Sequence, residues 1–260
     1  MLAGKVIAVI GSGPGLGSEV VRLALRDGAM VAFGARTADR LAGLQSSLDP
    51  GGARTLAGTI DVGDQASVDR FFGGVHERFG RVDGVAVVAA MVTTIGESLS
   101  IDDDVWRASF ETNVLGVTRV ARAARAGFGA AGGGSLVLVG TQASHIPMGG
   151  MGAYGATKGA AQVPLMHYLA RELGSARIRV NTVETSWMLG PLVQGCMDMM
   201  ATQQGTTAQA IISGIAAGWP IPEMPLDEDV AEAIVFLLSN RARMITGQVL
   251  RVNAGEYLSS

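Results

Sequence analysis

Short apolar runs alternate with segments of helical periodicity along most of the chain. The first run, Val6–Ile10, is entirely apolar and mostly β-branched, as expected of a parallel strand covered on both faces. In residues 16–25 apolar side chains recur every three or four positions, which predicts a helix, and residues 30–34 form a second apolar run. Residues 5–34 are therefore expected to form one βαβ unit.

The same alternation continues to the end of the chain and predicts the fold class. Strands that alternate with helices favour an α/β fold, a single-domain Rossmann-type doubly wound parallel sheet of about seven strands with helices on both faces. The further strands are predicted at residues 55–60, 84–89, 135–139, 178–183 and 248–252, and the further helices at residues 38–48, 65–79, 105–127, 154–173 and 229–238.

Residues 186–225 interrupt this alternation. The interval is rich in Met, contains Trp187 and Trp219, and has no run typical of a strand. It reads as an insertion over the edge of the sheet, either as extra core helices or as a segment that covers the substrate. With this insertion included, residues 1–260 are expected to form one domain.

Composition and charge narrow the class of protein. The net charge is −3 and no basic block occurs, so the chain lacks the electrostatic footprint of a nucleic-acid-binding protein. The single Cys196 excludes an intrachain disulfide, and three His far apart in sequence argue against a zinc site. The first apolar run is too short for a signal peptide or a membrane span. A cytoplasmic protein without a metal or a membrane partner is expected.

A glycine-rich segment follows the first predicted strand directly and precedes a helix. Backbone N–H groups and the helix N-terminus at such a place can hold a pyrophosphate, which predicts dinucleotide binding. This loop comprises Gly11, Ser12, Gly15, Leu16 and Gly17.

The end of the second strand bears on the choice of cofactor. An NAD-selective site has Asp or Glu there, whereas this chain has Ala35 followed by Arg36. No carboxylate would repel a 2′-phosphate, and Arg36 could pair with it. NADP(H) is therefore expected in preference to NAD(H). The alternative for Arg36 is a solvated surface charge.

Thr141, Tyr154 and Lys158 are spaced thirteen and then four residues apart. If Tyr154 and Lys158 share a helix face, the ammonium can lower the pKa of the phenol, normally about 10, so that Tyr154 exchanges a proton near neutral pH. A Tyr-x-x-x-Lys pair also occurs often by chance. The strand that precedes Thr141 would bring its hydroxyl back beside Tyr154.

The sequence resembles the short-chain dehydrogenase/reductase family over residues 4–256. The resemblance is carried by the spacing Gly11-x-x-x-Gly15-x-Gly17 and by a strand, a Gly/Pro-rich loop and the Tyr and Lys on a small-residue helix. It implies that Thr141 binds the substrate oxygen, Tyr154 is the acid/base, and Lys158 binds the nicotinamide ribose and biases Tyr154.

The resemblance also implies further site residues and an assembly. Asn113 would hold a water in the proton relay, although its amide could instead bond a neighbouring strand. Asp61 and Val62 would lie at the adenine ring, Ala89 and Ala90 beside the cofactor, and Met188 near the nicotinamide carboxamide. Pairing of the helices at 105–127 and 154–173 between subunits would give a homotetramer.

Three departures place the chain away from the centre of the family. Val87-Val88-Ala89-Ala90 stands for Asn-Asn-Ala-Gly, Thr185-Ser186 for Pro-Gly, and Thr141 for the usual serine. All the functional groups that the family's chemistry needs are nevertheless present.

The function expected from these features is NADP(H)-dependent hydride transfer to or from a hydrophobic ketone, aldehyde or secondary alcohol. The hydrophobic preference follows from the Met- and Trp-rich interval at 186–225. An enoyl reductase is less favoured, because those enzymes space the Tyr and Lys more widely. The alternative from another class is a cofactor-binding sensor or scaffold with little turnover.

Overall fold

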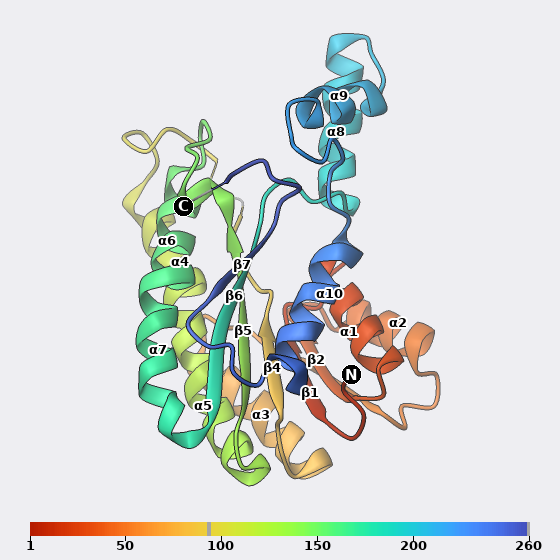
Figure 1. Ribbon diagram of the computed structural model, residues 1–260, viewed down its shortest axis with the longest axis vertical. Coiled ribbons are helices and arrows are strands. Elements are labelled where there is room, and N and C mark those ends of the chain that lie inside the picture. The colour runs from red at the N-terminus through yellow and green to blue at the C-terminus, as the bar shows by residue number, and fades with distance from the viewer. Residues whose placement is uncertain (93–94, 259–260) are drawn as a thin grey trace.

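Seven parallel strands form the sheet in the described part of the chain, residues 1–92 and 95–258 of a computed structural model (Figure 1). Their spatial order is β3-β2-β1-β4-β5-β6-β7. The order reverses between β1 and β4, and an open sheet has a crevice at the carboxyl ends of its strands at such a point. The strands are β1 (Val6–Ile10), β2 (Met30–Ala35), β3 (Thr55–Thr59), β4 (Gly84–Val87), β5 (Gly134–Thr141), β6 (Ile178–Thr185) and β7 (Val249–Val252).

Helices cover both faces of the sheet (Figure 1). One face carries α1 (Leu16–Arg26), α2 (Ala38–Leu48) and α10 (Asp227–Leu238), and the other carries α3 (Gln65–Phe79), α5 (Gly116–Ala131) and α7 (Met166–Leu173). Two further helices, α4 (Asp103–Phe110) and α6 (Gly152–Ala160), continue the second layer toward the carboxyl edge. The expected α/β fold is confirmed.

The first strand shows why the sheet is built this way. Val6, Ala8 and Ile10 pack into the core beneath α3 and α5, whereas Ile7 and Val9 pack into the core beneath α1 and α10. All five are fully buried. A strand between two helix layers has no solvent face, so it needs a continuous apolar run and not an alternating one.

Two helices expected to be continuous are interrupted by π-turns. The segment expected at 105–127 is α4, the π-turn η1 (Glu111–Leu115) and α5, and the one expected at 154–173 is α6, the π-turn η3 (Ala161–Leu165) and α7. In η3, Pro164 has no N–H to donate, and the wider turn accommodates its ring. The N–H groups of Gly116 and Met166 each donate to the carbonyl five residues earlier.

Several boundaries differ from those expected. The strand expected at 84–89 ends at Val87, because the N–H groups of Val88 and Ala89 both donate to the Ile10 carbonyl, at 2.8 Å. This shared acceptor ends the regular ladder. Conversely, β5 and β6 extend to Thr141 and Thr185, which brings polar side chains to the carboxyl edge.

The interval at 186–225 forms two helices that extend beyond this edge (Figure 1). They are α8 (Pro191–Gln204) and α9 (Ala208–Ala216), and they share a small core of their own around Met197, Ile212 and Met224. Trp187 and Trp219 pack against that core. That this segment covers a substrate stays a prediction. Within the described residues, no helix is long and apolar enough to cross a membrane.

Candidate active site

A cleft of about 560 Å³ opens where the strand order reverses. Most of the residues predicted for the cofactor line it. The exceptions are Ser12, Tyr154 and Lys158. Ser12 is buried, and its hydroxyl donates a hydrogen bond to the Val9 carbonyl at 3.1 Å. The lining includes Gly11, Gly15, Leu16, Gly17, Arg36, Asp61, Val62, Ala89, Ala90 and Met188.

Three glycines open the cleft toward the N-terminus of α1. A Cβ on Gly11 would lie 2.4 Å from the Ala89 nitrogen, and one on Gly17 would lie 2.2 Å from the Gly11 carbonyl oxygen. Gly15, the residue before α1, has φ 103°, which disfavours any side chain. These positions form a cradle of backbone next to a helix N-terminus, and a pyrophosphate group fits such a place.

Two residues that the sequence reasoning missed join Arg36 at the outer end of the cleft. Thr37 and Arg40 line it beside Arg36, directly after β2. Arg40 lies in the first turn of α2. An Arg four positions after Arg36 is the signal that could have found it. Two guanidinium groups at this end suit an anion.

Asp61 and Val62 line the cleft at the end of β3. The Asp61 carboxylate accepts from the Gly63 N–H at 2.9 Å, which is ordinary turn chemistry. Val62 is buried in the core. Both residues therefore line the cleft, one oxygen of Asp61 is used by its own turn, and their role at an adenine ring stays a prediction.

Thr141 and Tyr154 come together at the carboxyl edge. Thr141 ends β5 and is buried, and its hydroxyl accepts from the Ala143 N–H at 3.3 Å. Tyr154 lies near the start of α6 and is partly buried. Burial raises the pKa of the Tyr154 phenol, while a hydrogen bond with Thr141 acts in the opposite direction. The predicted pairing of these two side chains is present.

Lys158 lies on α6 one turn after Tyr154, as the sequence predicted, but its ammonium is bonded elsewhere. Its ammonium donates to the Val139 carbonyl on β5, and burial lowers the pKa of Lys158 from 10.5 to about 8. The largest effect on Tyr154 is burial, which raises the pKa of the phenol. In this arrangement a strand carbonyl takes up the ammonium, and the lowering of the phenol's pKa by Lys158 stays a prediction.

Asn113 lies in the π-turn η1, and both the oxygen and the nitrogen of its amide form hydrogen bonds within the protein. Its Oδ1 accepts from the Met91 N–H at 2.8 Å, and its Nδ2 donates to Thr157 Oγ1 at 3.0 Å and lies 3.3 Å from the Met91 carbonyl. The side chain thus ties the segment after β4 to α6. This is the alternative reading of an amide that bonds a neighbouring segment, and the role in a proton relay stays a prediction.

Asp227 is a further cleft residue that sequence reasoning missed. It is the first residue of α10, it is buried, and it lines the cleft. A Cβ on Gly190 would lie 2.1 Å from Asp227 Oδ2, so the absence of a side chain at Gly190 makes room for the carboxyl. Burial raises the pKa of Asp227, and Glu19 adds to this. An acidic residue in a first helical turn is common, and the sequence pattern carried no signal of this placement.

The pKa of Lys158 predicts a pH dependence of stability that Lys158→Met should remove. Between about pH 8 and 10.5 the unfolded chain binds more protons at this residue than the folded protein does. The free energy of unfolding of the wild type should therefore rise across this window relative to that of Lys158→Met, by about 3 kcal/mol.

Urea unfolding at several pH values measures this difference. Below about pH 8 the difference between the two proteins should be constant. Lys5→Met, at a partly exposed position before β1, controls for the loss of a lysine as such. Parallel stability curves for the wild type and Lys158→Met would contradict the burial of a titrating amine.

Comparison with known proteins places the chain in a family. Residues 11–256 match the family model described as "Enoyl-(Acyl carrier protein) reductase". The chain is 30% identical over 268 residues to 2,3-dihydro-2,3-dihydroxybenzoate dehydrogenase of Bacillus subtilis, with 99% of this chain and 97% of the relative covered.

Two solved structures are also similar. A short-chain type dehydrogenase/reductase from Mycobacterium ulcerans has TM-score 0.87 and 30% identity, covering 98% of this chain and 90% of the other. L-sorbose reductase from Gluconobacter frateurii, complexed with NADPH and L-sorbose, has TM-score 0.92 and 27% identity, covering 99% and 98%. The chain therefore belongs to the short-chain dehydrogenase/reductase family of NAD(P)-binding oxidoreductases.

Proposed function

We propose that the protein is an NADP(H)-dependent oxidoreductase that transfers a hydride between the nicotinamide and a hydrophobic ketone, aldehyde or secondary alcohol. The observation that carries this proposal is the Thr141–Tyr154 hydroxyl pair at the same sheet edge as the cleft. A phenol and a hydroxyl at one point suit an oxygen that gains negative charge and then a proton.

Each side chain has a part in this chemistry. When bound, the nicotinamide cofactor supplies or accepts the hydride. In reduction, Thr141 donates a hydrogen bond to the substrate oxygen, and Tyr154 donates the proton that completes the alcohol. In oxidation Tyr154 accepts that proton. Lys158, one turn along α6 from Tyr154, binds the nicotinamide ribose, and Asn113 holds the segments that surround them.

The preference for a carbonyl substrate rests on the spacing of Tyr154 and Lys158. The matched family model is described as an enoyl reductase, but three residues separate Tyr154 from Lys158 here, fewer than the family's enoyl reductases have. Both residues lie on α6 one turn apart. We therefore favour carbonyl chemistry over reduction of a carbon–carbon double bond.

The walls near α8 support a hydrophobic substrate. Met188, Leu192 and Val193 line the cleft, and Leu192 is 69% exposed on its rim. Thioether and aliphatic side chains in such positions favour an apolar ligand. The Gluconobacter frateurii relative was complexed with a sugar, so the apolar preference of this chain rests on its own residues.

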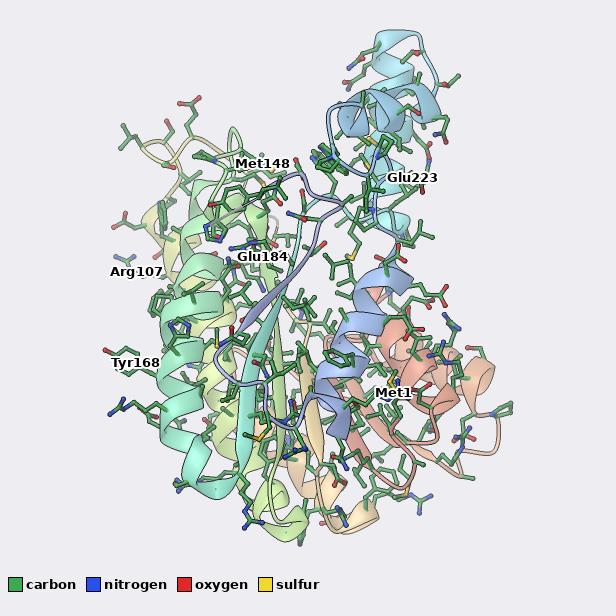
Figure 2. All side chains as sticks on the ribbon, viewed as in Figure 1. Met1, Arg107, Met148, Tyr168, Glu184 and Glu223 are labelled. Atoms are coloured by element: carbon green, nitrogen blue, oxygen red, sulfur yellow. The ribbon has the colours of Figure 1, made fainter. Side chains whose placement is uncertain are left out.

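Assembly as a homotetramer and a cytoplasmic location are part of the proposal and rest on the family resemblance. The helices expected to pair between subunits present side chains outward. Arg107 on α4 and Tyr168 on α7 point away from the sheet (Figure 2), and Tyr168 is 67% exposed.

Cofactor preference gives the first test of the proposed function. The wild type should bind NADPH more tightly than NADH by roughly ten- to hundredfold, because one charge-assisted contact contributes about 1.5–3 kcal/mol. Arg36→Ala should weaken NADPH binding and leave NADH binding nearly unchanged. Fluorescence titration measures all four affinities.

The control for this test is Arg70→Ala, which removes an exposed arginine from α3, away from the cleft lining. It should change neither affinity. Equal affinities of the wild type for the two cofactors would contradict the proposed role of Arg36.

The Asp227 carboxyl should make cofactor binding depend on pH. Its pKa is raised in the folded protein, and it is uncharged below that pKa. As pH rises through that pKa, the carboxylate repels the cofactor's phosphates, so affinity should fall. Asp227→Asn should abolish this fall and bind NADPH about tenfold more tightly above the pKa.

The charged groups near Asp227 define the control for this test. A groove next to the cleft is lined by Asp227 together with Glu19 and Arg22 of α1 and Glu228 of α10. Arg22 forms ion pairs with both glutamates. Glu228→Gln removes a nearby carboxylate that lies outside the cleft and should keep the pH dependence of the wild type. Calorimetric titration at several pH values measures both variants.

The hydroxyl pair gives the test of the mechanism. Thr141→Ser should stay active, because serine keeps the donor and the lone pairs. Thr141→Ala should lose about 10²–10³ in rate, and Tyr154→Phe should lose about 10²–10⁴ or more, because a preorganised donor and a positioned acid contribute on that scale. Single-turnover NADPH oxidation against a panel of ketones and aldehydes measures this.

Two outcomes would overturn the proposed function. Wild-type rates in Tyr154→Phe would make Tyr154 a structural residue of α6. NADPH binding without consumption across the whole panel would favour a sensor or scaffold.

A further inference from the structure

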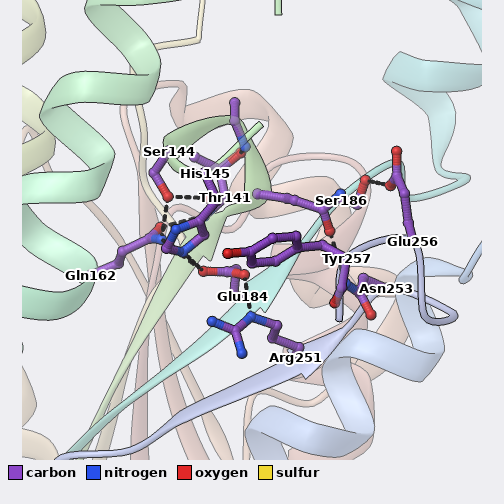
Figure 3. A network of polar contacts seen from close by, with 12 residues as sticks. Thr141, Ser144, His145, Gln162, Glu184, Ser186, Arg251, Asn253, Glu256 and Tyr257 are labelled. Carbon is purple, nitrogen blue, oxygen red and sulfur yellow. Dashed lines mark hydrogen bonds and ion pairs between the residues drawn. The ribbon is translucent and has the colours of Figure 1, made fainter. Parts of the chain in front are cut away.

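A buried carboxylate lies behind Thr141, outside the cleft lining. Glu184 on β6 is 1% exposed, and its position in the upper part of the sheet is labelled in Figure 2. Three side chains surround it (Figure 3). Its Oε2 lies 2.8 Å from Gln162 Nε2 and 2.9 Å from His145 Nε2, and its Oε1 lies 2.8 Å from Arg251 Nε.

Such a group is costly to bury, and its surroundings compensate for that cost. Burying an isolated carboxylate in a protein interior costs on the order of several kcal/mol of stability, unless neighbouring groups supply an opposite charge or hydrogen-bond donors. Arg251 of β7 supplies the opposite charge, and Gln162 supplies a neutral donor. An apolar side chain at Glu184 would fill the same place without this cost, so the carboxylate calls for a role beyond packing.

Gln162 connects Glu184 to the proposed active site. It lies in the π-turn η3 and is 1% exposed. Its Oε1 accepts from the Thr141 N–H at 2.7 Å, and its Nε2 donates to Ser144 Oγ at 2.6 Å as well as to Glu184. Gly140 leaves room for this amide, since a Cβ there would lie 2.6 Å from Gln162 Oε1.

The carboxylate determines which way the Gln162 amide faces. An ionised carboxylate only accepts hydrogen bonds, so the NH₂ group of Gln162 must point to Glu184. The amide oxygen then points to the Thr141 N–H. The reversed amide would place its oxygen against the carboxylate and its NH₂ against a backbone donor, so both contacts would be repulsive.

The C-terminal segment holds the same turn from the other side. The Tyr257 ring stacks on the His145 ring, with centroids 5.2 Å apart and an interplanar angle of 15°, and Arg251 lies 5.3 Å from the Tyr257 centroid. Asn253 donates to Gln142 Oε1 at 2.8 Å. The turn after Thr141 is thus held between Glu184 and the last residues described (Figure 3).

We propose that Glu184 is a positioning residue for Thr141: it orients the Gln162 amide, which fixes the backbone of Thr141 and the turn at 142–145. This inference rests on the proposed function for its catalytic consequence. The geometry of a donor to the substrate oxygen matters strongly, and a displacement of about 1 Å can cost about a hundredfold in rate. Glu184 acts through Gln162, and through His145 of the same turn, and contacts no reacting group.

Glu184→Gln tests the inference, because glutamine keeps the shape but can present either oxygen or NH₂ to Gln162. Amide hydrogen exchange at Thr141 and Ala143 should become at least about tenfold faster. Single-turnover hydride transfer should slow by about tenfold to a hundredfold, with NADPH affinity unchanged.

Asp83→Asn is the matched control. Asp83 is also a buried carboxylate paired with an arginine, Arg81, and it accepts from the Val6 N–H at 2.9 Å at the opposite edge of the sheet. The Asp83→Asn variant should be less stable than the wild type, but its amide hydrogen exchange at Thr141 and its rate of hydride transfer should not change. Equal effects of the two variants would reduce Glu184 to a stabilising residue and overturn the inference.

Gln162→Met provides a second, independent arm if Glu184→Gln fails to fold. Methionine keeps the length of the side chain and removes the amide's contacts with Thr141, Ser144 and Glu184, while Glu184 keeps Arg251 and His145. It should reproduce the faster exchange and the slower hydride transfer. Its effect on exchange at Thr141 should add little to that of Glu184→Gln, because both changes remove the orientation of Gln162 by Glu184.

The exchange measurement separates this inference from the proposed function. If the wild type transfers hydride to none of the substrates, the proposed function fails, and exchange at Thr141 still decides whether Glu184 orients Gln162. Unchanged exchange in both Glu184→Gln and Gln162→Met would overturn the inference, whatever the activity.

Discussion

The close approach of β1 and β4 at their carboxyl ends determines where this protein can bind a cofactor. The Ile10 carbonyl accepts two N–H groups from the segment after β4, and Gly11 then passes Ala89 with no space for a Cβ. Neighbouring strands that separate beyond this point leave the cleft between them. The cradle at α1 follows from the same constraint, because Gly17 must pass the carbonyl of Gly11.

Burial of polar groups is the second feature of the site. Tyr154, Lys158 and Asp227 all have pKa values moved toward the neutral form, and burial is the first cause in each case. Burial thus favours the neutral form of all three groups, and it lowers the pKa of Lys158 to about 8. Burial also raises the cost of losing a hydrogen bond at the carboxyl edge, because a group that lost its partner there would have no water to bond instead.

Interrupted helices place two buried amides where the site needs them. Asn113 lies in η1 and bonds Met91 and Thr157, and Gln162 lies in η3 and bonds Thr141 and Glu184. A π-turn changes the direction of the side chains that follow it, and such turns occur often at functional sites. In this protein both turns direct an amide toward the carboxyl edge of the sheet.

The sequence by itself determined the fold class, the order of strands and helices, and the place of the glycine loop. These features depend on local patterns, such as the continuous apolar run of β1 and the glycines before α1, which the chain carries whatever its surroundings. The pairing of Thr141 with Tyr154 was also predictable, because a strand and the helix after it return to the same edge.

Only the tertiary structure decided the remaining contacts. The Lys158 ammonium bonds the Val139 carbonyl, and Asp227 enters the cleft through the space left by Gly190. The group of Glu184, Gln162 and Arg251 likewise joins segments far apart in sequence. Each of these contacts compensates the cost of burying a polar or charged side chain. The neighbour that provides this compensation is determined only once the sheet and its helices have packed.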